Sequence, residues 1–238
     1  MRCSQADKGT LKLKYLNFHA HQPETSPDMA AVVCFEPDAP FPAIPPEQFA
    51  ACGIHPWSLG KLSAEEIEKC LSALTVHAAS GKLCAIGETG LDRLNGPELE
   101  LQMQVFRRHV ELAERHSLPL IIHCVRCYPE LLQIKKQSAG AVPWMIHGFN
   151  SNIRQLEQLL SHGCFISFGA PAMRGRNVKE SLLKAVPPER LCLETDDSPD
   201  DIKSIYGTAA AILKIDEAAL LEIMNHNFQN IFRKTNDR

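Results

Sequence analysis

Six side chains able to bind divalent metal ions each lie at or just past the end of a short apolar run. Imidazole nitrogens and carboxylate oxygens are the groups by which proteins hold Zn²⁺, Mn²⁺ or Mg²⁺. Short continuous apolar runs are typical of buried strands, so the pattern predicts a metal site at one end of a barrel. The six residues are His19, His21, Glu88, His123, His147 and Asp196.

The spacing of these residues indicates how they could act. Side chains two positions apart in a strand point the same way, so His19 and His21 should face the same side. Glu88 is the natural bridge between two cations, because a carboxylate can offer one oxygen to each. Two such cations lower the pKa of water and stabilise both oxygens of a displacement at phosphorus, without a side-chain nucleophile. We therefore expect Glu88 and Asp196 to be catalytic, with Asp196 also accepting a proton.

Two further residues are predicted to bind substrate. His55, in the sequence GIHPW, could contact a substrate phosphate or cap the turn before Pro56. Arg126 follows His123 by two positions and could meet a phosphate or pair with a carboxylate. Asp92 could orient a metal-bound imidazole, as carboxylates commonly do, or cap a turn.

Eight strand-like runs must position these residues, with helix-like segments between the later ones. Most of the runs are continuously apolar, as expected for parallel strands covered on both faces. Strand and helix alternate often enough to favour an α/β fold of the closed (β/α) TIM-type barrel kind over an open sheet. No helix is predicted between residues 20 and 48, so the first repeats should be irregular. The strands are predicted at 11–19, 30–35, 49–54, 83–88, 119–124, 144–148, 163–168 and 190–195, and the helices at 63–80, 97–117, 129–139, 152–162, 176–186, 201–213 and 216–233.

The composition is that of an ordinary globular protein. The 238 residues are 45% hydrophobic and 22% charged, with a formal net charge of −3. This charge gives no global positive field, so a nucleic acid would have to be held locally by metals and a few cations. No repeat or low-complexity linker divides the chain. We expect a single domain over 1–238 with a loose terminus over 1–10.

The nine cysteines do not indicate disulfides, because their number is odd and many lie inside apolar runs. This usage, with no apolar stretch of signal-peptide or membrane-spanning length, predicts a cytoplasmic protein. Cys124 and Cys127 form a C-x-x-C pair that could be redox-active, but no second pair completes a thiolate metal site. Arg174 and Arg176 could contact a phosphate or lie in a solvated loop.

Six motifs together resemble the TatD family of metal-dependent deoxyribonucleases, within the amidohydrolase superfamily. They recur in the family's order over about residues 15–200. The resemblance implies a TIM-type barrel that hydrolyses DNA, as a 3′→5′ exonuclease acting on single strands or 3′ ends, with no obligate protein partner and no membrane. The motifs are HxH (His19, His21), GIHPW (Gly53 to Trp57), AIGETGLD (Ala85 to Asp92), LPLIIHCVR (Leu118 to Arg126), HGFNSN (His147 to Asn152) and LETDDSP (Leu193 to Pro199).

The same resemblance implies two divalent metal ions, Mg²⁺, Mn²⁺ or Zn²⁺, and divides the ligands between them. One set is His19, His21, Glu88 and Asp196, and the other is Glu88, His123 and His147.

The chain departs from the family pattern at three places. Asn17 stands where the family commonly has Asp, and Arg93 where an aromatic residue often follows GLD. After Asp196 the sequence is acidic, over 197–201, instead of the usual Pro- and Arg-containing stretch. That stretch helps shape the substrate cleft, so the chemistry transfers more safely than the substrate.

Two other functions stay open from the sequence. One is an amidohydrolase acting on a small amide, lactone or nucleobase, although many of these bridge their metals with a carboxylated lysine where this chain has Glu88. The other is a catalytically silent binding scaffold, against which the retention of all six ligand types argues.

Overall fold

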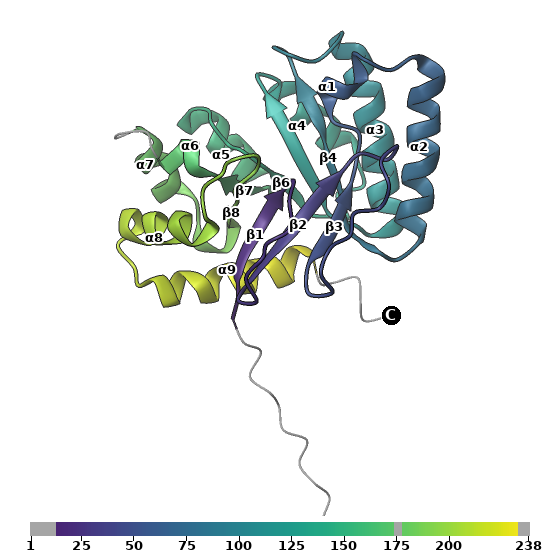
Figure 1. Ribbon diagram of the computed structural model, residues 1–238. Helices are drawn as coiled ribbons and strands as arrows, with labels where there is room; N and C mark the ends of the chain where they lie inside the picture. The colour runs from purple at the N-terminus through teal and green to yellow at the C-terminus, as the bar shows by residue number, and fades with distance from the viewer. Residues whose placement is uncertain (1–12, 174–177, 233–238) are drawn as a thin grey trace, which may run out of the picture.

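Eight parallel strands form a nearly closed barrel in the computed structural model, which describes residues 13–173 and 178–232 (Figure 1). Each strand pairs in parallel with the next one along the chain, which confirms the predicted TIM-type barrel. The loose terminus predicted over 1–10, together with Arg174 and Arg176, lies outside the described residues. The strands are β1 (Tyr15–Ala20), β2 (Met29–Phe35), β3 (Phe49–Cys52), β4 (Leu83–Asp92), β5 (Leu120–Val125), β6 (Trp144–Ile146), β7 (Phe165–Phe168) and β8 (Leu191–Leu193).

Helices cover the barrel from β3 onwards. The Ser63 hydroxyl accepts from the Glu66 N–H and the Glu66 carboxylate accepts from the Ser63 N–H, which forms a capping box at the start of α2. The short helices α1 and α6 and the 3₁₀ turn η1 were not predicted, because segments of three or four residues show no periodicity. The helices are α1 (Pro56–Leu59), α2 (Ala64–Ala79), α3 (Leu99–His116), α4 (Tyr128–Gln137), α5 (Ile153–Ser161), α6 (Ala170–Met173), α7 (Val178–Ala185), α8 (Ile202–Leu213) and α9 (Glu217–Phe232), with η1 at Pro188–Arg190.

The first two connections contain no helix, as the sequence predicts. Within residues 13–60, which are all described, β1 leads to β2 and β2 leads to β3 through irregular segments. In the second of these, Ile44 packs against the buried Ala31 and Val33 of β2. The proline-rich segment 37–46, which contains Ile44, therefore covers a part of the sheet that a helix covers in a regular barrel.

The barrel closes between its first and last strands, along a line that we call the seam. In the described structure, the only strand-type bridge at the seam is the isolated parallel one between Ala20 of β1 and Asp196, in the segment that follows β8. The Tyr206 hydroxyl of α8 lies against the open edge of β1, accepting from the Leu16 N–H (3.1 Å) and donating to the Leu16 carbonyl (3.0 Å). Side-chain hydrogen bonds thus take the place of ladder bonds at the seam.

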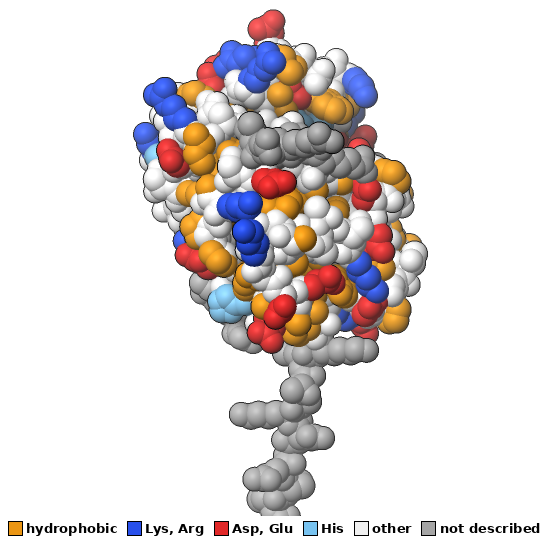
Figure 2. Space-filling view, turned by 90° about the vertical axis from the view of Figure 1, so that its left-hand side faces the viewer, with side chains coloured by type: hydrophobic (Ala, Val, Ile, Leu, Met, Phe, Trp, Pro, Cys, Tyr) orange, Lys and Arg blue, Asp and Glu red, His pale blue; other side chains and the backbone are white. Residues whose placement is uncertain are grey.

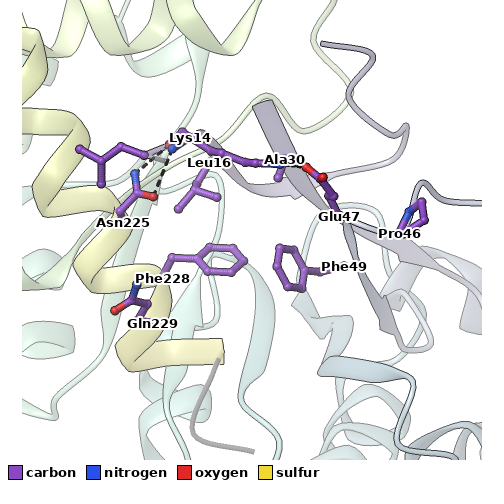
Figure 3. Close-up of a pocket in the computed structure, with 10 residues that line it drawn as sticks. Lys14, Leu16, Ala30, Pro46, Glu47, Phe49, Asn225, Phe228 and Gln229 are labelled. Atoms are coloured by element: carbon purple, nitrogen blue, oxygen red, sulfur yellow. Dashed lines mark hydrogen bonds and ion pairs between the residues drawn. The ribbon is translucent and has the colours of Figure 1, made fainter. Parts of the chain in front are cut away.

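Helix α9 crosses below the amino ends of the first strands (Figure 1). Its Asn225 amide accepts from the Lys14 N–H (3.3 Å) and donates to the Lys14 carbonyl (2.8 Å), and its Phe228 ring lies 4.8 Å from that of Phe49. A cavity of about 440 Å³ opens beside these groups (Figure 3). It lies at the end of the barrel opposite the predicted metal ligands.

No helix in the described parts of the chain combines the length and the apolar character that crossing a bilayer requires.

Candidate metal centre

The six predicted ligands meet at the carboxyl ends of the strands. His19 is the second-to-last residue of β1, His123 lies near the end of β5, and His147 directly follows β6. Glu88 was predicted at the end of its strand but lies inside β4, because β4 continues to Asp92. All of them nevertheless converge, because the inner side of a barrel brings neighbouring strands together.

One group of donor atoms surrounds Oε2 of Glu88. This oxygen lies 3.4 Å from Nε2 of His19 and 3.5 Å from Nε2 of His21. Oδ1 of Asp196 lies 3.3 Å from the same His19 nitrogen and 3.4 Å from the same His21 nitrogen. Four ligands held tetrahedrally about 2.1 Å from a zinc ion lie about 3.4 Å from one another, so these residues fit a divalent cation. This is the first of the two predicted sets.

A second group surrounds the other oxygen of the same carboxylate. Oε1 of Glu88 lies 3.0 Å from Nε2 of His55, 3.1 Å from Nδ1 of His123 and 2.7 Å from Nε2 of His147. His55, Glu88 and His123 form a set that could hold a metal ion, and the His147 nitrogen lies 3.2 Å from that of His123. Glu88 therefore offers one oxygen to each group, in the position of a bridge.

The burial of these groups supports the fit to a cation. His19 is fully buried, and its Nε2 has no hydrogen-bond partner although two carboxylate oxygens lie within 3.4 Å. A buried polar nitrogen without a partner costs free energy, which a bound ion would remove.

Strong mutual electrostatics accompany this arrangement. Burial raises the pKa of Glu88, but the imidazoles of His147 and His19 outweigh burial and hold it well below its ordinary value. Hydrogen bonds with Asp196 and Glu88 raise the pKa of His21 to about 10. Without a cation His21 therefore holds a proton at neutral pH, which a cation must displace, so metal binding by His21 releases a proton.

Asp92 has both of the roles that the sequence left open. Its Oδ1 accepts from the N–H groups of Leu94 (2.7 Å) and Asn95 (3.0 Å), which caps the turn after β4. Its Oδ2 lies 3.1 Å from Nε2 of His123 and accepts from Nε1 of Trp57 (2.6 Å). Burial alone would raise the pKa of Asp92, but these hydrogen bonds lower it to about 2. A charged carboxylate thus orients the ring of His123.

Glu194 has a comparable position on the other side of the site and was missed in the sequence. It is fully buried, and its Oε1 lies 3.5 Å from Nδ1 of His147 and accepts from the Gly148 N–H (2.5 Å). The signal was available in LETDD, because Glu194 and Asp196 are two positions apart and so share a side of the chain. The carboxylate of Glu194 thus faces the ring of His147 as an ion-pair partner, at a longer distance than that of Asp92 from His123.

Two side chains on the buried face of α3 form hydrogen bonds to the main chain of segments that carry site residues. Oε1 of Gln102 accepts from the Asp92 N–H (2.7 Å), and its Nε2 donates to the Asp92 carbonyl (3.0 Å). Nε2 of His109 accepts from the Ile54 N–H (3.0 Å), next to His55 in the chain, while Nδ1 faces the Val105 carbonyl (2.8 Å). These contacts fix the main chain at Asp92 and at Ile54 by buried side-chain hydrogen bonds.

A glycine permits the close contact of β4 with β5 at this point. A Cβ on Gly90, whose φ is 150°, would lie 1.9 Å from the carbonyl oxygen of His123. No other residue type fits there without moving β5, so Gly90 allows Asp92 and His123 to come together.

The two predicted substrate-binding residues have different positions. His55 lies within the donor cluster, and its Nδ1 also accepts from the Trp57 N–H (3.1 Å) as the cap of α1. Arg126 is exposed after β5, with a φ of 55°, and its carbonyl accepts from Nε of Arg93 (3.1 Å). Substrate binding by His55 and Arg126 stays a prediction.

A cavity of about 390 Å³ adjoins the cluster, a size typical of small-ligand sites. It lies at the ends of β6, β7 and β8, and Asp196 belongs both to its wall and to the first donor group. The cavity at the amino end is larger but contains none of the donor atoms, so the smaller one is the candidate substrate site. Its other lining residues are Gly148, Phe149, Asn150, Gly169, Pro171, Ala172, Glu194, Thr195, Asp197 and Ser198.

The surface beside α8 shows no strong field of one sign. In Figure 2, acidic and basic side chains are interspersed on this side of the molecule. This agrees with the net charge of −3 and leaves local contacts to bind any polyanion.

Comparison with known proteins adds a family match. The family model described as TatD related DNase matches residues 42–233. An uncharacterized metal-dependent hydrolase of Escherichia coli K12, YjjV, is 32% identical over 154 residues, which cover 64% of this chain and 58% of YjjV. A 3′-5′ ssDNA/RNA exonuclease TatD of Erwinia billingiae is 30% identical over 153 residues, which cover 62% of this chain and 57% of that protein. The chain thus matches less than two thirds of the length of these two relatives.

Among solved structures, that of the TatD homologue YjjV from E. coli is similar with a TM-score of 0.78 at 20% identity. The similarity covers 94% of this chain and 99% of the YjjV chain, and it concerns the fold.

Proposed function

Because the chain belongs to the TatD related DNase family, we propose that it is a divalent-metal-dependent hydrolase that cleaves phosphodiester bonds in DNA. The observation that carries the proposal is the carboxylate of Glu88, with Oε2 in one group of donors and Oε1 in another. This arrangement suits two cations, which we propose to be Mg²⁺, Mn²⁺ or Zn²⁺. When bound, two cations activate water and stabilise negative charge on phosphoryl oxygens.

The side chains of the site have separate tasks in this proposal. Oδ1 of Asp196 faces both His19 and His21, so the other oxygen of that carboxylate is the candidate acceptor of a proton from the attacking water. Burial would raise the pKa of Asp196, but the neighbouring imidazoles of His19 and His21 outweigh burial and hold it well below its ordinary value. Asp196 therefore stays charged at neutral pH, as a ligand of a cation must.

The orienting carboxylates complete the arrangement. Asp92 and Glu194 hold the rings of His123 and His147 so that one nitrogen of each points to Oε1 of Glu88. A fixed ring loses little entropy when it binds an ion, so the site is organised before the cation arrives.

We propose a 3′→5′ exonuclease acting on single strands or 3′ ends. In support, a relative 30% identical to this chain is named as such an exonuclease. The cavity next to Asp196 has the size for one terminal nucleotide, and we propose that Arg126 and His55 contact phosphate.

We also propose that the chain acts as a single barrel, without an obligate protein partner, in the reducing cytoplasm. The eight cysteines among the described residues are all free and buried, Cys124 and Cys127 included. Burial raises the pKa of the Cys124 thiol well above its ordinary value, which argues against a redox role.

A nuclease assay tests the proposal. The purified protein is loaded with Mg²⁺, Mn²⁺ or Zn²⁺ and given single- and double-stranded DNA labelled at either end, with Glu88→Gln protein as the control. We expect mononucleotides to be released from the 3′ end of the single strand by the wild type alone. A metal-loaded protein that leaves DNA intact but opens a small amide or lactone would instead be an amidohydrolase. A protein that binds no cation would be a scaffold.

A further inference from the structure

An exposed tryptophan stands at the edge of the donor cluster. The side chain of Trp57, in α1, is 47% exposed, whereas the chain's other tryptophan, Trp144, is fully buried. The ring centroid of Trp57 lies 4.9 Å from that of His55 and 5.8 Å from that of His123. Leaving so large an apolar surface in water next to a reactive site costs free energy, which is informative in a way that a scattered exposed residue is not.

The ring is held rigidly in this exposed position. Its Nε1 donates to Oδ2 of Asp92 (2.6 Å), and its main-chain N–H donates to Nδ1 of His55 (3.1 Å). Pro56 precedes it in the first turn of α1 and restricts the main chain. The polar edge of the indole is thus bonded to the protein, and part of its apolar surface remains accessible.

Cations lie on the same side of the barrel mouth. Arg93 and Arg126 follow β4 and β5 directly, next to the end of β3 from which α1 begins, and both are exposed. Asp197 and Asp201, by contrast, are exposed after β8 on the other side. Nη2 of Arg93 pairs with Oε1 of Glu130 (2.5 Å), which offsets part of its charge. The exposed indole of Trp57 and the exposed guanidinium of Arg126 still occur together over β3–β5, so a polyanion with aromatic rings is favoured there over the acidic side after β8.

We propose that Trp57 stacks on an unpaired nucleobase next to the phosphodiester that is cleaved. This inference rests on the proposed nuclease function and deepens it, because a base can stack on a side chain only when it is free of its own strand partner. It makes Trp57 a substrate-binding residue that selects single-stranded nucleic acid. Stacking on an aromatic side chain is tolerant of sequence, since every base has a π face.

A kinetic comparison distinguishes stacking of Trp57 on a base from a structural role of Trp57 as the hydrogen-bond donor to Asp92. The substrates are a single-stranded oligodeoxynucleotide and an oligomer of the same length with stable abasic residues, which has the same phosphates but no bases. For wild type, KM should be lower for the strand with bases, by about 5- to 150-fold. In Trp57→Ala the ratio of the KM for the abasic strand to the KM for the strand with bases should fall towards one. Trp57→Phe keeps a ring but loses the hydrogen bond to Asp92, and in this variant most of the difference between the two KM values should remain.

A matched control is Phe41→Ala. Phe41 is an exposed aromatic whose ring lies 5.2 Å from that of Phe35, 6.1 Å from that of His77 and 5.7 Å from Nζ of Lys82, and none of these three residues belongs to the donor groups. Its replacement should leave the KM ratio at the wild-type value. A Trp57→Ala protein whose KM rises equally for both substrates would overturn the stacking role.

Fluorescence tests the contact without catalysis. Since Trp144 is buried, quenching on titration with an oligonucleotide reports Trp57. The titration uses an Asp196→Asn protein, which should leave the strand intact. The strand with bases should quench the tryptophan fluorescence, and the abasic strand should quench it much less. In the double variant that also carries Trp57→Phe, the strand with bases should no longer change the fluorescence.

The outcomes distinguish the two proposals. DNA cleavage without base-dependent quenching, and with an unchanged KM ratio in Trp57→Ala, overturns stacking and leaves the nuclease standing. Base-dependent quenching without cleavage under any cation upholds stacking and overturns the nuclease. The absence of both binding and cleavage overturns both.

Discussion

Glu88 is the residue on which both donor groups depend, because each group uses a different oxygen of its carboxylate. The type and order of the six predicted ligands were enough to predict from the sequence that these side chains lie together, while metal binding by them stays a prediction. The approach of His55 to Oε1 of Glu88 was not predictable, because the direction of a side chain after Gly53 depends on how β3 meets β4. A Cβ on Gly53 would lie 2.6 Å from the carbonyl oxygen of Glu88, which shows how close that approach is.

Replacing a charged ligand should abolish turnover while the fold remains. We expect Glu88→Gln and Asp196→Asn to lower kcat/KM by more than about 100-fold, because mutation of even the groups behind metal ligands costs 10–100-fold. The measurements are the activity on DNA, the metal content of the purified protein, and its far-UV circular dichroism, which reports whether the fold is intact. Near-wild-type activity in either variant would refute the assignment.

Glu194 should matter without touching the cation. In Glu194→Gln the ring of His147 loses its charged partner, so the affinity for a divalent cation should fall by about 10- to 100-fold. Calorimetric titration with Mn²⁺ measures this. Glu114→Gln is the control, because the carboxylate of Glu114, in α3, accepts from the Gly140 N–H (3.1 Å) and belongs to neither donor group. Equal affinities in the two variants would contradict the role of Glu194.

At the scale of elements, α3 shows what periodicity can and cannot predict. Its extent and its apolar face follow from spacings of three and four residues. Its two buried polar residues, Gln102 and His109, also lie on that face, but their partners Asp92 and Ile54 belong to other elements. Periodicity therefore located the helix, whereas its hydrogen bonds to the site required the tertiary structure.

His109 should make the stability of the protein sensitive to acid. The unprotonated Nε2 of His109 accepts from the Ile54 N–H. Burial lowers the pKa of His109 from 6.5 to about 4. Between these values the unfolded chain binds more protons than the folded one, so the free energy of unfolding falls as pH falls. The loss from this residue reaches about 3 kcal/mol near pH 4. Urea unfolding of wild type and His109→Gln at pH 7 and pH 4.5 measures it.

In His109→Gln an uncharged acceptor replaces the imidazole, so the part of the acid sensitivity due to His109 should vanish. An identical loss of stability between the two pH values in both proteins would contradict this account. In His109→Leu the Ile54 N–H loses its acceptor, which costs about 1–3 kcal/mol at either pH.

For the whole molecule, the barrel was predictable because strand and helix alternate from β3 onwards, and eight parallel strands need crossover connections. The irregular start was also predictable, since residues 37–46 contain too much proline for a helix. What the sequence did not indicate is how the seam closes, because the contact of Tyr206 with Leu16 joins elements at opposite ends of the chain.

Divalent cations should stabilise the whole barrel. A ligand that binds only the folded state at 100 times its Kd adds about 2.7 kcal/mol, which for a protein of this size raises Tm by about 5–10 °C. Thermal unfolding followed by circular dichroism, with EDTA and then with excess Mn²⁺, measures the shift. Glu88→Gln should show almost none, and an equal shift in that variant would place the binding elsewhere.

The seam has a consequence for folding kinetics. The side chain of Asn17 bonds to Thr195 across it, over 178 positions of the chain. Closing so long a loop costs more conformational entropy than forming a local strand–helix unit, so these contacts should form late. Interactions that are absent from the transition state slow unfolding and hardly change the rate of folding. A cation held by His19, His21 and Asp196 should therefore prolong the lifetime of the folded barrel without speeding its assembly.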